Sequence, residues 1–89
     1  MYRLRLVCLG IPSLSGPEGA SDITKEFADH RTWFSNVTCR WDGHSLILEA
    51  DSDFDSDGRA LLDEYSDCIS AYVSGDFDSS ISIDSVVKV

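Results

Sequence analysis

The feature that most constrains the fold is the dipeptide Asp42-Gly43, which separates two segments with the alternation of β-strands. Segment 33–41 is rich in β-branched and aromatic residues. Segment 44–50 returns with Leu46 and Leu48 on one face. An Asp-Gly pair readily adopts the positive φ angles of a type I′ turn. The sequence therefore predicts a β-hairpin closed by such a turn.

Two further strands are expected, one before the hairpin and one near the end of the chain. The first has the period of two typical of a strand with one buried face, and it ends at Gly10. Its inward residues are Leu4, Leu6 and Cys8, and they alternate with Arg3, Arg5 and Val7. Residues 80–89 alternate in the same way, which predicts the last strand.

Helical periodicity appears twice. The clearer stripe recurs every three or four residues and consists of Leu61, Leu62, Tyr65, Cys68, Ile69, Tyr72 and Val73, with Gly75 as the expected stop. A shorter helix is expected to begin with Ser21 or Asp22 as its N-cap and to end near Thr32. Residues 10–19 hold three glycines and both prolines, so a loop without regular structure is expected there.

The resulting order is strand, helix, strand, strand, helix, strand, and it predicts an α+β fold. This is the order of a ferredoxin-like βαββαβ sandwich, a four-stranded antiparallel sheet with two helices on one face. The first strand would lie between the third and fourth, so Arg3 and Arg5 would stand beside Glu49 and Asp84 on the open face. A chain of 89 residues is too short for two cores, so residues 1–89 are expected to form a single domain.

The net charge of −9 is distributed unevenly along the chain. Residues 1–41 carry four acidic and five basic residues, a formal charge of +1, whereas residues 42–89 carry twelve acidic and two basic residues, a formal charge of −10. Direct binding of nucleic acid through its phosphates requires a surplus of Lys and Arg, so this class is disfavoured. The asymmetry instead predicts one strongly negative side on the folded domain.

The acidic half centres on alternate aspartates from Asp51 to Asp57. In an extended segment, side chains at i and i+2 would be about 6.6 Å apart, close to the phosphate spacing of a single nucleic-acid strand. Aromatic anchors for such a surface would be Phe54, Tyr65 and Phe77. The candidate partner-binding residues are Asp51, Asp53, Phe54, Asp55, Asp57, Asp63, Glu64, Asp67, Asp76 and Asp78.

The expected function is that of a non-catalytic acidic protein, which covers a basic, nucleic-acid-binding surface of a partner. In size and charge the chain resembles immunity proteins that cover nuclease toxins, and phage proteins that block restriction or CRISPR complexes. The expected partner is a basic protein or a nucleic-acid-processing complex, with no direct binding of nucleic acid or membrane. The chain itself is expected to be a monomer or a weak homodimer without a cofactor.

Calcium binding is the alternative. Residues 53–64 carry acidic side chains at the first, third, fifth and twelfth positions and Gly58 at the sixth, so they resemble the calcium loop of EF-hand proteins. The resemblance implies a Ca²⁺ site, whose ligands would be Asp53, Asp55, Asp57, the backbone carbonyl of Arg59, and Glu64. A third interpretation is a solvated loop in which Ser56 or Asp57 caps the following helix.

Catalysis is not expected, because His30 and His44 lie outside any nucleophile motif. The three cysteines, Cys8, Cys39 and Cys68, fall on apolar faces and should be buried, reduced thiols. Trp33 should serve packing, although an exposed Trp33 would indicate a binding surface. No apolar run is long enough to span a membrane, so a cytoplasmic protein is expected.

Overall fold

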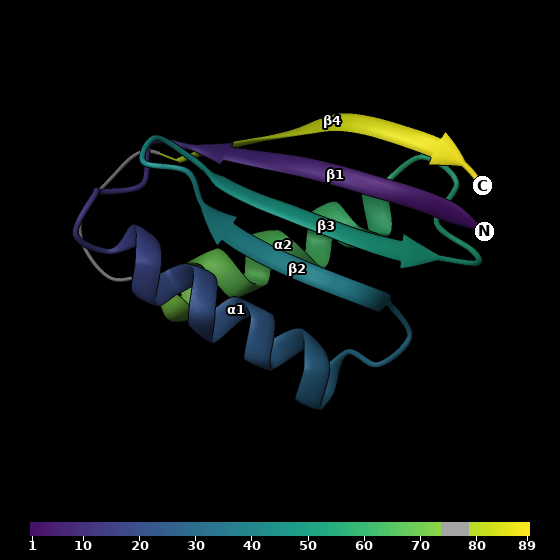
Figure 1. Ribbon diagram of the computed structural model, residues 1–89, viewed down its shortest axis with the longest axis horizontal. Coiled ribbons are helices and arrows are strands. Elements are labelled where there is room, and N and C mark those ends of the chain that lie inside the picture. Colours follow the sequence, from purple (N-terminus) through teal and green to yellow (C-terminus); the bar gives the residue numbers. More distant parts are fainter. Residues whose placement is uncertain (74–78) are drawn as a thin grey trace.

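The sheet has the predicted four antiparallel strands, and both helices cover one of its faces (Figure 1). The computed structural model describes residues 1–73 and 79–89. Its elements are β1 (Tyr2–Leu9), α1 (Gly16–His30), β2 (Ser35–Trp41), β3 (Leu46–Ser52), α2 (Arg59–Tyr72) and β4 (Ser80–Lys88). The strand order β2-β3-β1-β4 places β1 between β3 and β4, which confirms the ferredoxin-like fold.

The helix-covered face of the sheet forms the core. Leu4, Leu6 and Cys8 of β1 are fully buried, and Leu6 pairs with Leu48 of β3. Ile23 and other apolar residues of α1 and α2 pack into the same cluster, which confirms the inward faces predicted from the alternation. On β4 the register shifts by one residue opposite the step from Arg5 to Leu6 of β1, so this strand carries a bulge.

Helix α1 begins at Gly16, ahead of the predicted N-cap at Ser21 or Asp22, so the expected loop is confirmed for residues 10–15 and was wrong for residues 16–19. The N-cap residue is Ser15, and Pro17 lies in the first turn, where a missing N–H removes no helical hydrogen bond. Gly16 lies against the Trp41 ring with no space for a side chain. A Cβ on Gly19 would lie 3.1 Å from Cγ2 of Val73. These glycines therefore allow close packing of the helix instead of interrupting it.

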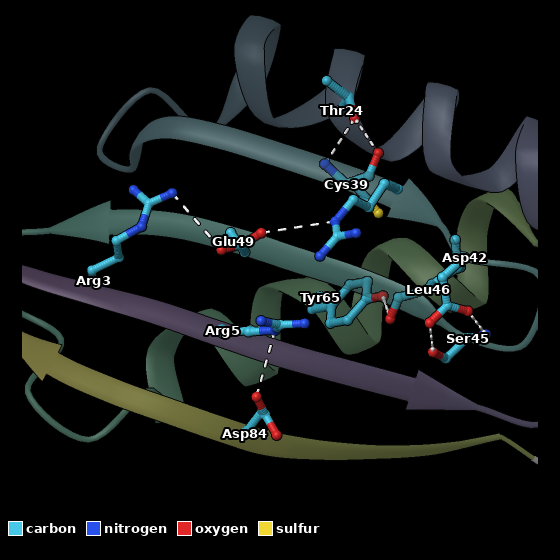
Figure 2. Close-up of polar contacts among 11 residues, drawn as sticks. Arg3, Arg5, Thr24, Cys39, Asp42, Ser45, Leu46, Glu49, Tyr65 and Asp84 are labelled. Carbon is cyan, nitrogen blue, oxygen red and sulfur yellow. Dashed lines mark hydrogen bonds and ion pairs between the residues drawn. The ribbon is translucent and has the colours of Figure 1, made fainter.

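The β2–β3 hairpin is present, but the predicted type I′ turn is wrong. The strands are joined by residues 42–45, and of these only Gly43 has a positive φ. The Asp42 carboxylate accepts hydrogen bonds from the backbone N–H of His44 at 2.8 Å and of Ser45 at 2.7 Å. Figure 2 shows this aspartate folded over its own loop. Asp42 thus closes a longer turn with its side chain, and these bonds lower its pKa.

Helix α2 has the predicted buried stripe, with Leu61, Tyr65, Cys68 and Ile69 facing the core. The Tyr65 hydroxyl donates a hydrogen bond of 3.0 Å to the carbonyl oxygen of Leu46, so its one polar group is satisfied inside the core (Figure 2). The other members of the predicted stripe differ in burial: Val73 is buried, Leu62 is half-buried and Tyr72 is exposed. The predicted stop at Gly75 lies outside the described residues.

Candidate functional site

The acidic segment from Asp51 to Asp57 does not form the extended row expected from its alternation. Asp51 and Ser52 are the last residues of β3, and the chain then turns. The Ser52 hydroxyl oxygen accepts hydrogen bonds from the backbone N–H of Phe54 at 3.2 Å and of Asp55 at 3.0 Å. The segment after Ser52 is therefore not an extended strand, and its carboxylates differ in burial, so the spacing argument from an extended strand was wrong.

Asp55 points into the protein and is only 4% exposed. Its carboxylate accepts hydrogen bonds from the backbone N–H of Ala60 at 3.2 Å and of Leu61 at 2.9 Å. These N–H groups lie in the first turn of α2, where they have no partner within the helix. Asp57 accepts a third such bond, from the N–H of Arg59 at 3.0 Å. Asp55 therefore anchors the start of α2 and presents no carboxylate to a partner.

Asp51 belongs to an ion-pair network on the open face of the sheet. It accepts hydrogen bonds from Arg3 at 3.0 Å and from Asn36 at 2.8 Å. Arg3 also lies 3.8 Å from Glu49. The corresponding pair at the other side of β1 joins Arg5 to Asp84 at 3.5 Å, as Figure 2 shows. The expected neutralisation of Arg3 and Arg5 is confirmed. Asp51 is one of the carboxylates engaged in this network.

Glu64 lies between the two helices, where it pairs with Arg31 at the end of α1. The distance from Nε of Arg31 to the Glu64 carboxylate is 2.7 Å, and Nη1 of Arg31 lies 3.2 Å from Glu26. The Tyr72 hydroxyl donates to Glu26 at 2.7 Å, and this bond raises the pKa of Tyr72. The arrangement links α1 to α2, so Glu64 is engaged within the fold.

Four of the predicted aspartates remain exposed on the β3–α2 loop and on α2. We call this set the acidic surface; its members are Asp53, Asp57, Asp63 and Asp67. Asp57 pairs loosely with Arg59 at 3.7 Å, and both side chains are largely exposed. The other three form no ion pair with any residue in 1–73 or 79–89. The predicted contacts Asp76 and Asp78, and the anchor Phe77, lie outside the described residues.

Next to Asp53 of this set lies a cluster of three aromatic residues from two loops. Phe34 is buried, whereas Trp33 and Phe54 are each 51% exposed. The Phe34 ring centroid is 5.6 Å from that of Phe54 and 6.4 Å from that of Trp33. Phe54 was predicted as an anchor, but Trp33 was not among the predicted site residues. Its exposure, which no periodicity indicates, adds it to the candidate surface.

Two of the side chains expected to bind calcium in the alternative site have other partners in the fold. Asp55 accepts hydrogen bonds from α2, and Glu64 pairs with Arg31. In the part of the chain that the structure describes, no three His, Cys, Asp or Glu side chains are placed to hold a metal ion. In this structure the loop is shaped by capping of α2, and calcium binding by residues 53–64 stays a prediction of the EF-hand resemblance.

The cysteines are free. Cys8 and Cys68 are buried as predicted, and Cys39 is half-buried. Burial raises the pKa of Cys8 to about 11 and that of Cys39 to about 12. The thiolate is the reactive form, so both side chains are inert at neutral pH.

Comparison with protein-family models, curated proteins and solved structures finds no match to this chain. Neither α1 nor α2 is long and apolar enough to span a bilayer.

Proposed function

We propose that this protein acts without catalysis, by binding a basic, nucleic-acid-binding surface of a macromolecular partner and blocking it. The observation that carries the proposal is the acidic surface, whose members Asp53, Asp63 and Asp67 lack an ion pair among the described residues. Asp53 is next to the exposed Phe54 on the β3–α2 loop, and Asp63 and Asp67 are exposed on the helix that follows. Such inhibitors include immunity proteins and phage proteins that oppose restriction or CRISPR complexes. Three free cysteines fit the reducing cytoplasm, where we place it.

Charge and aromatic area have separate roles in this proposal. Exposed carboxylates attract a basic partner and raise the association rate, an effect screened beyond about 10 Å at 0.1 M salt. Half-exposed rings such as Trp33 and Phe54 supply apolar contact area, which slows dissociation. Together they give a complex that forms quickly at low salt and lasts long enough to exclude a competing nucleic acid.

The test is capture of the partner from a cell lysate by the immobilised protein, at about 0.05 M and about 0.5 M salt. We expect a basic protein to bind at low salt, to be lost at high salt, and to be displaced by single-stranded nucleic acid. The double variant Asp63→Asn/Asp67→Asn should capture much less of it. The matched control is Glu18→Gln/Asp29→Asn, which removes two exposed charges from α1.

Equal capture by the two double variants would show that the acidic surface is not the contact and would overturn the proposal. Capture that is insensitive to both salt and nucleic acid would do the same. Because all four substituted side chains are exposed or lie at helix surfaces, circular dichroism should show both variants to be folded.

A further inference from the structure

The two edge strands of the sheet, β2 and β4, differ in whether other parts of the protein bond to their outward backbone groups. At the β2 edge, the Thr24 hydroxyl of α1 accepts a hydrogen bond of 3.2 Å from the backbone N–H of Cys39 and lies 3.3 Å from the carbonyl oxygen of the same residue. Figure 2 shows Thr24 above this strand. Trp41, two residues further along β2, packs against Gly16 of α1. Helix α1 thus occupies the backbone N–H and C=O of Cys39, with which another strand would pair.

The β4 edge is open. This strand is nine residues long, and its one neighbour in the sheet is β1 (Figure 1). No side chain within residues 1–73 and 79–89 forms a hydrogen bond with its backbone. In an edge strand about half of the backbone N–H and C=O groups face away from the neighbouring strand. β4 therefore offers donors and acceptors to an added strand on either side of its bulge.

A hollow of about 320 Å³ lies beside this open edge, between α2 and the start of β4. Its lining combines the half-buried apolar side chains of Leu62 and Ile81 with Asp63, Ser66 and Ser79. Nearer the start of α2, the helix touches β4, because Ile83 packs against Gly58. The hollow thus has an apolar wall on each side and an exposed carboxylate at its rim.

We propose that the β4 edge and this hollow together bind an extended, basic segment of the partner, which adds a fifth strand to the sheet. The inference rests on the proposed function, since it specifies which part of a basic partner is bound. Backbone hydrogen bonds to β4 would supply affinity, and alternate side chains would enter the hollow. Residues at i and i+2 of a strand are about 6.8 Å apart, close to the rise of about 6 Å between Asp63 and Asp67 on α2.

This spacing defines the bound segment. Two Lys or Arg residues separated by one residue would lie near the carboxylates of Asp63 and Asp67, which form no ion pair among the described residues. An apolar residue further along the same face would contact Leu62 and Ile81. An acidic segment would be repelled, so charge complementarity selects the occupant.

The probe is a synthetic ten-residue peptide with Lys at two alternate positions and Val at the next position on the same face. Backbone amide exchange is followed by NMR with and without it. We expect amides of β4 to become protected on binding, and amides of β2 to be unchanged. A peptide with Glu in place of Lys, and one N-methylated at alternate amides, should each fail to bind.

Two α2 variants with the same change in charge provide the matched comparison. Ser66→Arg places a bulky cation in the lining of the hollow, whereas Ser70→Arg places it one turn further along, at an exposed position outside that lining. We expect Ser66→Arg to weaken peptide binding by about tenfold or more and Ser70→Arg by about twofold or less, since direct like-charge contact costs more than distant repulsion.

Protection at β2, equal effects of the two arginines, or no peptide binding at millimolar concentration would each overturn the inference. Protection of β4 that depends on protein concentration, with a dimer in sedimentation, would instead assign the edge to a second copy of the chain. A further outcome separates the two proposals. If the Asp63→Asn/Asp67→Asn variant captures the lysate partner poorly but the Ser66→Arg variant captures it normally, the partner does not dock at β4 and the hollow, whereas the proposed function is retained. If the two double variants capture it equally, the proposed function itself fails.

Discussion

The carboxylate of Asp55 lies 2.9 Å from the backbone nitrogen of Leu61, across the loop that leads into α2. Through this bond and the one from Ala60, the buried Asp55 side chain holds the β3–α2 loop against the start of α2. Asp53 and Phe54 are both exposed within the turn that the Ser52 hydroxyl closes. One inward aspartate thereby positions the exposed residues of the candidate surface.

Replacing Asp55 should therefore lower stability. Asp55→Ala leaves two N–H groups of α2 without their partner, and loss of a helix cap costs about 1–2 kcal/mol. Urea unfolding followed by circular dichroism measures the difference. The matched control is Asp53→Ala, an exposed side chain two residues earlier, for which a change within about 0.5 kcal/mol is expected. Equal costs for the two variants would contradict the capping role.

The pair of Arg31 and Glu64 should contribute to stability and not to partner binding. Both side chains are partly shielded, with 19% and 29% exposed. Glu64→Gln is expected to cost about 0.5–1 kcal/mol in urea unfolding, in the range of partly exposed ion pairs. In the capture experiment it should behave as the unmodified protein, whereas Asp63→Asn, one residue away, should weaken capture. Weaker capture by Glu64→Gln would show instead that Glu64 contacts the partner.

Removing the exposed aromatic rings should weaken the complex with little loss of stability. Phe54→Ala leaves Phe34 in place and removes a side chain that is already half exposed. We expect partner dissociation to accelerate about tenfold or more, as for aromatic residues at interface centres, with an unfolding cost of about 1 kcal/mol. Surface plasmon resonance gives the rate. Leu14→Ala, at a side chain that is 95% exposed, is the control and should leave the rate unchanged.

Stability should fall at alkaline pH because of the buried thiols and Tyr65. Burial raises the pKa of Cys8 to about 11 and that of Cys39 to about 12, and it raises the pKa of Tyr65 as well. A group whose pKa is raised in the folded state stabilises that state fully below its unfolded pKa, and this stabilisation is lost as pH rises towards the folded value. The thermal midpoint should be level up to about pH 8 and decline between about pH 8.5 and 12, since the folded pKa of Cys39 is about 12. Iodoacetamide should label these thiols at neutral pH only in denaturant.

Calcium should not stabilise the protein, because the two carboxylates that would close the loop site are engaged elsewhere. A bound ion raises stability by RT ln(1 + [L]/Kd), so even a site with a Kd of about 0.1 mM would give about 1.4 kcal/mol at 1 mM. The expected thermal midpoint is therefore the same with 1 mM calcium and with a chelator, to within what ionic strength alone produces. A rise that magnesium at the same concentration does not reproduce would establish the EF-hand-like site.

The periodic parts of the fold were predictable from the sequence because a single rule governs each of them. Leu4 and Leu6 alternate along one sheet face, and the α2 stripe repeats at helical spacing. The start of α1 was not predictable in this way. Gly16 and Gly19 are helix breakers by intrinsic propensity, yet here they allow Trp41 and Val73 to approach, and those contacts come from distant parts of the chain.

The site was less predictable than the fold, because charge along a chain does not specify which way each side chain points. Asp53 and Asp55 are equivalent in the alternating pattern, but one is exposed and the other is buried. Their difference depends on where α2 begins and on the Ser52 hydroxyl, both of which are properties of the folded loop. Trp33 likewise reaches the surface because Phe34, its neighbour, takes the buried position.

The unequal edges of the sheet also limit how this protein can assemble. Thr24 occupies the backbone of Cys39 in β2, whereas no side chain of residues 1–73 and 79–89 bonds to the backbone of β4, so strand addition is favoured at β4 over β2. Propagation into a fibre requires two open edges, one to receive a strand and one to offer the next. We therefore expect strand addition to end after one step, in a complex of fixed stoichiometry.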